Sequence, residues 1–353
     1  MGKRLVVCCD GTWNTPDQMN GGQPCPTNVT RLALALAPTS TDGTEQRLFY
    51  HRGVGAERWE RIRGGAFGMG LSRNVQEAYR FVVDNFEPGD ELYFFGFSRG
   101  AYTARSTVGL IRNAGVLRRE HASRIGEAYA LYRSRANVTK PKGTEAKLFR
   151  RSYSQETRIR FIGVWDTVGA LGIPMSGLRW FNRRWQFHDT DLSTTVDAAF
   201  QALAIDETRK PFEPAVWSHQ PGAGAQRLEQ VWFSGCHCDI GGGYPDSSLS
   251  DIALLWMADR ARSCGLAFSE EALLPGDAKG REFAVRPDPL GELHDSRKLF
   301  YRLLRPYHRP IGKAEDGHEY VASSAVQRRE KDSSYAPSGL ADHLAGPHQV
   351  MDV

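Results

Sequence analysis

Short apolar runs rich in β-branched and aromatic residues alternate along the chain with stretches of helical periodicity. Five of these runs end in a Gly, Asp or Ser turn. This alternation is typical of βαβ units and predicts a mostly parallel sheet, whose ligand sites lie at the carboxyl ends of the strands. The runs are residues 5–9, 46–51, 91–97, 159–165 and 230–234.

Apolar residues between Gly70 and Phe86 recur every three or four positions, which predicts a helix packed on the sheet. Residues 118–158 and 175–200 look like insertions over the sheet. The second holds Trp180 and Trp185, which we expect to form a substrate lid. We expect one catalytic domain over residues 1–275, with residues 276–353 as a C-terminal extension packed on it.

Composition excludes several classes of protein. The chain has 353 residues, 41% hydrophobic and 24% charged, with a net charge of +4, so nothing favours a nucleic-acid partner. The sequence contains no uninterrupted run of about 18 apolar residues, the length that a helix needs to span a bilayer. Peripheral contact with a membrane stays open. The first apolar run is too short for a signal-peptide core. We expect a cytoplasmic protein, although a specialised secretion system could export it without a signal peptide.

The clearest chemical motif is Gly-Phe-Ser-Arg-Gly at residues 96–100. In a nucleophile elbow, a serine sits on a sharp turn between a strand and a helix, and small residues two positions away on either side relieve crowding. An apolar strand precedes this motif and a helical pattern with small residues follows it. The context therefore indicates that Ser98 is a nucleophile. A plain Gly-rich turn between a strand and a helix, with a serine that caps the helix, could have the same sequence.

A serine nucleophile needs an imidazole base and a carboxylate that orients the base. Asp166 directly follows one predicted strand, and His237 follows the next, in a Gly-rich open loop predicted over residues 235–244. We expect Asp166 to be the acid and His237 the base. Asp239 could replace Asp166, which could instead accept bonds from turn amides. The competing histidines are His219, His343 and His348.

The oxyanion of a tetrahedral intermediate needs backbone amides already in place. We expect one from Arg99, directly after the nucleophile, and a second from Gly11 or Thr12, after the first strand. Asp10 could support the site or hold its own loop by bonding Thr12 or Asn28.

Seven sequence blocks together resemble an α/β-hydrolase-related family of bacterial and fungal proteins, best known for type VI secretion lipase effectors with phospholipase A activity. The resemblance covers about residues 4–250 and implies an α/β-hydrolase-like fold and a Ser-Asp-His hydrolase of acyl esters without a cofactor. The resemblance implies catalytic roles for Ser98 through GFSRG, for Asp166 through VWDTVG, and for His237 through the His-x-Asp-x-Gly-Gly-Gly-Tyr segment. Gln201 and Ala322 stand where family members often carry histidines. The remaining blocks are CDGTWN, TNVTRL, GGAFGMGL and the segment from FHDT to FEPAVW.

Two other classes of function are open at this point. A metal-dependent hydrolase could use Asp10, His237 and Asp239, because imidazole and carboxylates bind divalent ions. A non-catalytic binding module on a hydrolase fold is the other alternative. A phosphate-transferring enzyme of the haloacid-dehalogenase type is excluded, since Cys8 occupies the place of its nucleophilic aspartate. The acyl chain, the leaving group and the oligomeric state stay undetermined.

Overall fold

The structure of the protein is a computed structural model. It describes most of the chain, with gaps between the described segments. The described residues are 2–11, 17–20, 22–53, 66–168, 192–220, 222–276, 283–297, 299–313, 318–346 and 348–353.

The centre of the molecule is an eight-stranded sheet in which every neighbouring pair of strands is parallel. Its strands, in spatial order, are β12 (Val350–Met351), β11 (Glu319–Ala322), β10 (Arg227–Phe233), β9 (Ala198–Ala204), β8 (Phe161–Trp165), β5 (Glu91–Phe97), β1 (Arg4–Cys9) and β4 (Gln46–His51). Two small antiparallel pairs join β2 (Met19–Asn20) to β3 (Gln23–Pro24) and β6 (Val116–Leu117) to β7 (Ser154–Gln155).

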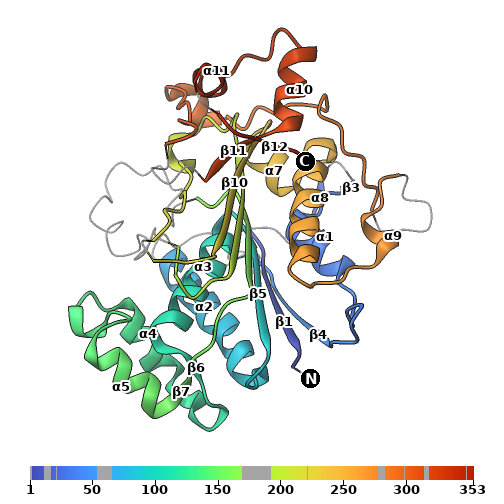
Figure 1. Ribbon diagram of the computed structural model, residues 1–353. Helices are drawn as coiled ribbons and strands as arrows, with labels where there is room; N and C mark the ends of the chain where they lie inside the picture. Colours follow the sequence, from blue (N-terminus) through green and yellow to red (C-terminus); the bar gives the residue numbers. More distant parts are fainter. Residues whose placement is uncertain are drawn as a thin grey trace.

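Helices cover both faces of the sheet. In Figure 1, α1 (Asn28–Ala35) and α8 (Ser248–Ser263) lie on one side, and α2 (Ala66–Asn85) and α3 (Arg99–Ala114) lie on the other. The remaining helices are α4 (Ile125–Arg133), α5 (Thr144–Tyr153), α7 (His237–Gly241), α9 (Glu270–Leu273), α10 (Ser323–Lys331) and α11 (Ser338–Leu344). Short 3₁₀ turns are η2 (Arg119–Arg124), η3 (Asn137–Thr139), η4 (Lys210–Phe212) and η5 (Leu299–Leu303).

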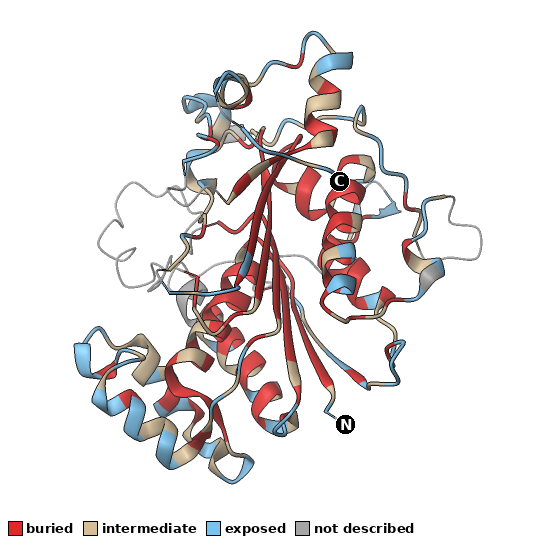
Figure 2. Ribbon diagram, in the orientation of Figure 1, coloured by how far each residue is buried: buried red, intermediate tan, exposed pale blue. Residues whose placement is uncertain are grey.

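Alternate residues of β1, β5 and β8 pack into two separate cores. Along β1, Val6 and Cys8 join the core under α1 and α8, whereas Leu5 and Val7 join the core under α2 and α3. Strands covered on both faces read as continuous apolar runs, as β1 does. Figure 2 shows the result: the central strands are buried along almost their whole length, and exposed residues gather on the outer helices α4 and α5.

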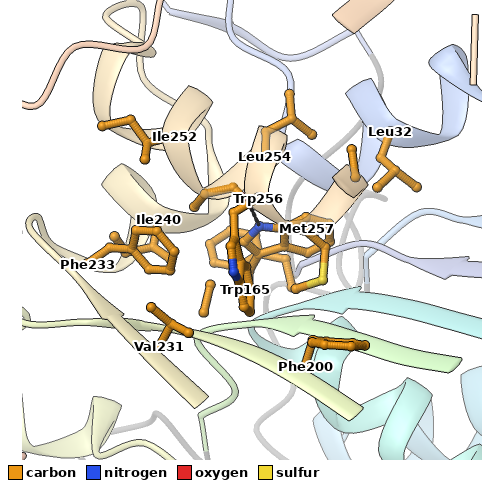
Figure 3. Close-up of a cluster of buried hydrophobic side chains, with 14 of the residues drawn as sticks. Leu32, Trp165, Phe200, Val231, Phe233, Ile240, Ile252, Leu254, Trp256 and Met257 are labelled. Carbon is orange, nitrogen blue, oxygen red and sulfur yellow. Dashed lines mark hydrogen bonds between the residues drawn. The ribbon is translucent and has the colours of Figure 1, made fainter. Parts of the chain in front are cut away.

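Trp165 anchors the end of β8 in the core beneath α8. Its side chain is fully buried beside Trp256 and Met257, as Figure 3 shows, and its indole N–H donates to the Ala253 carbonyl oxygen at 3.3 Å. Asp166 is the next residue, so this packing fixes the point at which that carboxylate leaves the sheet.

The predicted fold class and the five predicted strands are confirmed. Two strands have the predicted bounds, β4 and β5, and the other three shift by one to three residues at an end. The predicted helix is α2, which begins at Ala66 instead of Gly70. One local expectation is wrong: His237 begins a short helix, α7, instead of lying in an open loop.

Two segments differ in detail from their expected roles, and the expected lid residues of a third lie outside the described residues. The 118–158 segment packs through α4 on α2 and α3, so it covers the helical layer and not the sheet itself. In the 175–200 segment, Trp180 and Trp185 lie outside the described residues, and its last residues already belong to β9. The C-terminal segment adds β11 and β12 to the central sheet, where strand periodicity had faded in the sequence.

Candidate active site

Strand order singles out the carboxyl end of β1 as the expected position of a ligand. This strand has β4 on one side and β5 on the other, so the winding of the sheet reverses here. In open α/β sheets, ligands bind outside the carboxyl ends of the strands at such a reversal. Asp10 follows β1 and Ser98 follows β5, so both residues lie at this point.

Ser98 occupies a strained turn between β5 and α3. Its φ of 56° and ψ of −118° are angles that non-glycine residues rarely adopt. A Cβ atom on Gly100 would lie 2.0 Å from the Cys9 carbonyl oxygen, and one on Gly96 would lie 2.6 Å from the Ala101 nitrogen. The two glycines therefore allow the helix to approach β1 and β5 closely, as the motif predicted.

The Ser98 side chain is 8% exposed and makes no hydrogen bond to any described residue. Its backbone amide donates to the Trp165 carbonyl oxygen at 3.1 Å, which ties the elbow to the end of β8. Arg99 is the first residue of α3, and the amides of a first helical turn have no acceptor within the helix. That amide is therefore suited to receive an anion beside Ser98.

Asp166 and His237 form a buried pair at the same edge of the sheet. The distance between Asp166 Oδ2 and His237 Nδ1 is 2.5 Å, and both side chains are almost fully buried. Asp166 has a φ of 38°, so it is the second non-glycine residue with a left-handed backbone in the described chain. An ionised carboxylate only accepts, so Nδ1 donates and Nε2 of a neutral ring is left as an acceptor.

Two aromatic rings enclose His237. The Phe97 ring, directly before Ser98, lies with its centroid 4.6 Å from that of the imidazole, and the Phe212 ring lies at 5.0 Å nearly at right angles. The Phe97 contact brings the base and the elbow to the same place, since one strand supplies both Phe97 and Ser98. These apolar walls also limit the orientations open to the ring.

Arg309 holds the other edge of Asp166. Its Nη1 and Nη2 donate to the two carboxylate oxygens at 2.6 and 3.0 Å, and it also donates to the carbonyl oxygens of Ala204 and Phe212. Burial by itself raises the pKa of Asp166, but the charge of Arg309 and the bond from His237 outweigh burial and hold that pKa well below its usual range. Asp166 is therefore ionised at neutral pH.

The segment after β9 supplies the rest of the surroundings. Glu207 is fully buried, receives two side-chain bonds from Arg209 at 2.7 and 2.8 Å, and accepts the His237 backbone amide at 3.3 Å. The Arg209 guanidinium lies 3.6 Å from the Phe212 ring centroid. Glu207, Arg209 and Phe212 thus fix both the backbone and the ring of the histidine.

Asp239 pairs with another histidine. It accepts the Cys236 amide at 2.9 Å, which caps α7, and its Oδ1 lies 2.7 Å from His294 Nδ1. Burial raises the pKa of Asp239, although the Cys236 and His294 bonds oppose this. The structure therefore pairs Asp166, not Asp239, with His237. His219 packs against His318, and His343 lies near His348.

Asp10 holds the first loop together. It accepts hydrogen bonds from the Thr27, Thr30 and Tyr50 hydroxyls at 2.7, 2.9 and 2.7 Å, instead of from the expected Asn28. It also accepts the Gly11 amide at 2.6 Å, so that amide is already engaged. Of the two amides expected to complete the oxyanion hole from this loop, only Thr12 is left, and it lies outside the described residues.

Comparison with known proteins identifies the family. The family model for the catalytic domain of Tle1-like phospholipase effectors of the type VI secretion system matches residues 3–260. The chain belongs to this family. The Tle1-like match ends before Arg309, β11 and β12, all of which complete the sheet or the site in this structure.

Individual relatives are more distant. An uncharacterized protein of Saccharomyces cerevisiae, YEL023C, is 28% identical over 242 residues, which is 62% of this chain and 33% of the yeast protein. A solved structure of an uncharacterized Pseudomonas aeruginosa protein has a TM-score of 0.47 at 18% identity, with 80% of this chain and 49% of that chain covered. A Tle1 effector bound to the VgrG spike has a TM-score of 0.42 at 20% identity, with coverages of 70% and 52%. The Tle1-like chain thus spans from about a third to a half of these proteins.

The predicted metal-dependent alternative lacks a suitable cluster. In the described part of this Tle1-like chain, no three His, Cys, Asp or Glu residues are grouped to hold a metal ion. Asp10 and Asp239 instead bond to separate hydroxyls, amides and His294. No helix within the described ranges is long and apolar enough to cross a bilayer.

Sequence patterns did not reveal Arg309 or Glu207 as parts of the site. Arg309 is 143 residues from Asp166 along the chain and lies in a segment without strong periodicity. Glu207 lies in the block from FHDT to FEPAVW, which contributed to the resemblance without any role of its own. The only local signal was an acidic residue two positions from an arginine after an apolar run, a pattern common on protein surfaces.

Proposed function

We propose that this chain is a serine hydrolase that cleaves acyl esters of lipids through an acyl-enzyme. The observation that carries the proposal is the buried Asp166–His237 pair, whose imidazole packs on Phe97, the residue directly before a serine on a strained elbow. The family supports a lipid ester as substrate, since its model describes phospholipase effectors. The three groups follow the order serine, acid, histidine along the chain, as in other α/β hydrolases.

In the proposed mechanism, His237 Nε2 accepts the proton of the Ser98 hydroxyl as Oγ attacks the ester carbonyl carbon. The Arg99 amide, with Thr12 as the predicted second donor, stabilises the oxyanion. The tetrahedral intermediate then collapses, and His237 returns the proton to the leaving alcohol. Water, deprotonated by His237, finally attacks the acyl-enzyme and releases the carboxylic acid and free Ser98.

Asp166 has two tasks in this mechanism. Its bond to Nδ1 keeps the proton on that nitrogen, so that Nε2 is free to act as the base. It also stabilises the imidazolium that forms during each step. Arg309 is proposed as a positioning residue: it aligns the carboxylate with two hydrogen bonds and keeps it ionised, without touching the reacting atoms.

A fluorophosphonate probe tests the activated serine directly. We expect the wild-type protein to be labelled, and both Ser98→Ala and His237→Ala to lose labelling by several orders of magnitude. His294→Ala is the matched control, because His294 also pairs with a buried aspartate but belongs to the second pair, and we expect it to be labelled like the wild type. Labelling that survives in Ser98→Ala would contradict the assignment of the nucleophile.

Substrate class requires a separate measurement. Mass spectrometry of phosphatidylglycerol and phosphatidylcholine incubated with the protein should detect free fatty acid and lysophospholipid. Addition of a chelator should leave this hydrolysis unchanged, since the proposed steps use no metal. If the probe labels the protein but no phospholipid releases fatty acid, the assignment as a serine hydrolase stands and the proposed lipid substrate is wrong.

A further inference from the structure

The segment that carries Arg309 is strongly cationic. Residues 297–313 contain six Lys and Arg residues and no Asp or Glu. Of these six residues, Arg309 forms the ion pair with the carboxylate of Asp166. Of the other basic residues that the structure describes, Arg302, Arg305 and Lys313 are exposed and give this part of the surface a positive charge.

Within this segment, the rim formed by residues 301–305 also exposes apolar side chains. Leu303 is 83% exposed and Leu304 is 38% exposed. Arg302 and Arg305 flank the two leucines and are exposed as well. Single exposed leucines are ordinary on protein surfaces, but two adjacent ones between arginines form the combination found on surfaces that bind the lipid–water interface.

The arginines of the rim are weakly engaged by the protein. Arg302 lies 3.9 Å from Asp295 in a pair exposed on both sides, and its Nε donates to the Arg297 carbonyl oxygen. Arg305 makes no ion pair with any described residue. Their charges are thus available to an external anion.

Contacts connect the rim to the candidate active site. Arg209 lies 5.6 Å from the Tyr301 ring centroid and 3.6 Å from that of Phe212, and Phe212 packs on the His237 ring. Ser296, just before this segment, donates to Glu207 at 3.0 Å. In Figure 1, the last part of the chain, coloured orange to red, lies at the end of the sheet where β10 and β11 finish.

We propose that the 301–305 rim docks the protein on an anionic phospholipid surface, with Leu303 and Leu304 entering the acyl region and Arg302 and Arg305 contacting the headgroup phosphates. This inference deepens the proposed function, on which its catalytic consequence rests: docking here brings lipid esters to the edge of the site. A cationic rim matches an anionic headgroup layer, and exposed leucines match its apolar interior.

Vesicle sedimentation tests docking without turnover, in a Ser98→Ala background. We expect binding to vesicles of equal parts phosphatidylglycerol and phosphatidylcholine, much weaker binding to phosphatidylcholine alone, and weaker binding at high salt. Each of Arg302→Gln and Arg305→Gln should lower affinity about fivefold, the usual contribution of one basic residue near such a surface. Leu303→Ser with Leu304→Ser should lower it about tenfold or more.

The matched control is Leu148→Ser with Arg151→Gln. It removes an exposed leucine and a nearby exposed arginine from α5, which lies far from the rim in Figure 1. We expect this variant to bind like the Ser98→Ala parent. Equal losses in the control and rim variants, unchanged binding in the rim variants, or no binding of the parent to anionic vesicles would each overturn the proposal. An unchanged thermal midpoint of each variant verifies its folding.

Two readouts separate this inference from the proposed function. Fluorophosphonate labelling with Ser98 intact reports on the site without any membrane. If labelling succeeds but the rim variants bind vesicles normally, only the docking inference fails. If labelling fails while the rim variants lose vesicle binding as expected, docking stands and the serine hydrolase is wrong.

Discussion

The described part of the molecule contains two aspartate–histidine pairs with different surroundings: both residues of the first are buried, whereas the histidine of the second is partly exposed. Asp166 and His237 lie 2.5 Å apart, and Asp239 and His294 lie 2.7 Å apart. The pKa of Asp166 is lowered because Arg309 and His237 together outweigh its burial, whereas the pKa of Asp239 is raised because burial outweighs its hydrogen bonds. The same two residue types therefore behave differently, and the charge of Arg309 is the largest of the contributions that oppose burial at Asp166.

The two pairs also differ in what their histidines face. His237 lies between Phe97 and Phe212, next to the serine elbow. His294 instead stacks on Tyr244 with a centroid distance of 3.9 Å, and its partner carboxylate caps α7. We interpret the first pair as catalytic and the second as a support that holds α7, and hence the backbone of His237, in place.

The same substitution in each aspartate should give the largest difference in activity between the two pairs. Asp166→Asn should lower kcat by about 10⁴, because the neutral amide no longer keeps the proton on Nδ1 of His237. Asp239→Asn should leave kcat near the wild-type value and lower the free energy of unfolding by about 1 kcal/mol through a weaker cap. Ester hydrolysis and urea unfolding measure the two effects. Equal losses of kcat would show that the pairs share one role.

Loss of Arg309 should have the next largest effect. Arg309→Gln should lower the free energy of unfolding by about 3–5 kcal/mol, since a buried charge loses its partner. Arg309→Lys keeps the charge but not the two-pronged geometry, so it should recover part of both stability and kcat.

Arg305→Gln provides the control for this experiment. Arg305 is an exposed arginine four residues away, and its substitution should change stability by less than about 0.5 kcal/mol. Urea unfolding and fluorophosphonate labelling rates test all three variants. A fully active Arg309→Gln would contradict the positioning role.

The stability difference between wild type and Arg309→Gln should itself depend on pH. A lowered folded pKa stabilises the protein in full above the unfolded value of about 3.9, and this contribution is lost as pH falls toward the folded value. Without Arg309 the pKa of Asp166 rises, so ionised Asp166 contributes less stability to the variant and less stability is lost on acidification. The unfolding free energies of the wild type and of Arg309→Gln, measured from neutral to acid pH, should therefore approach each other as pH decreases. A constant difference would argue against Asp166 as the titrating partner.

The smallest effect should come from the second pair. His294→Gln keeps a polar group near Asp239 but removes the imidazole that bonds the carboxylate, so we expect a loss of about 1 kcal/mol in stability and no change in labelling by the probe. Thermal unfolding measures the first effect. A strong loss of labelling would show that His294 contributes to catalysis after all.

Local features of the site could be predicted from the sequence. The Ser98 elbow needs only a strand, two glycines and a helix within about twenty neighbouring residues, and such patterns are set by local sterics. Strand β5 has the predicted bounds because Leu92–Phe97 form one buried run of aromatic and other apolar residues directly after Glu91. Asp166 and His237 could be selected for the same reason, since Asp166 directly follows a recognisable strand and His237 lies a few residues after the next one.

Features that depend on distant contacts could not be predicted. Strand β9 reads Ala-Ala-Phe-Gln-Ala-Leu-Ala, which lacks the β-branched residues typical of strands, and its burial between β8 and β10 decides its conformation. β11 and β12 are short strands of four and two residues at one edge of the sheet. Arg309 is 143 residues from Asp166 along the chain and meets it only in the folded structure, so no local pattern marks it.

The two left-handed residues of the described chain, Ser98 and Asp166, have a consequence for how the protein would evolve or be engineered. Such backbone angles cost of the order of 1–3 kcal/mol each in a residue with a side chain, and glycine would relieve them. Both strained positions coincide with proposed catalytic residues. A selection for thermal stability alone would therefore favour replacing them, and the most heat-resistant descendants would be inactive.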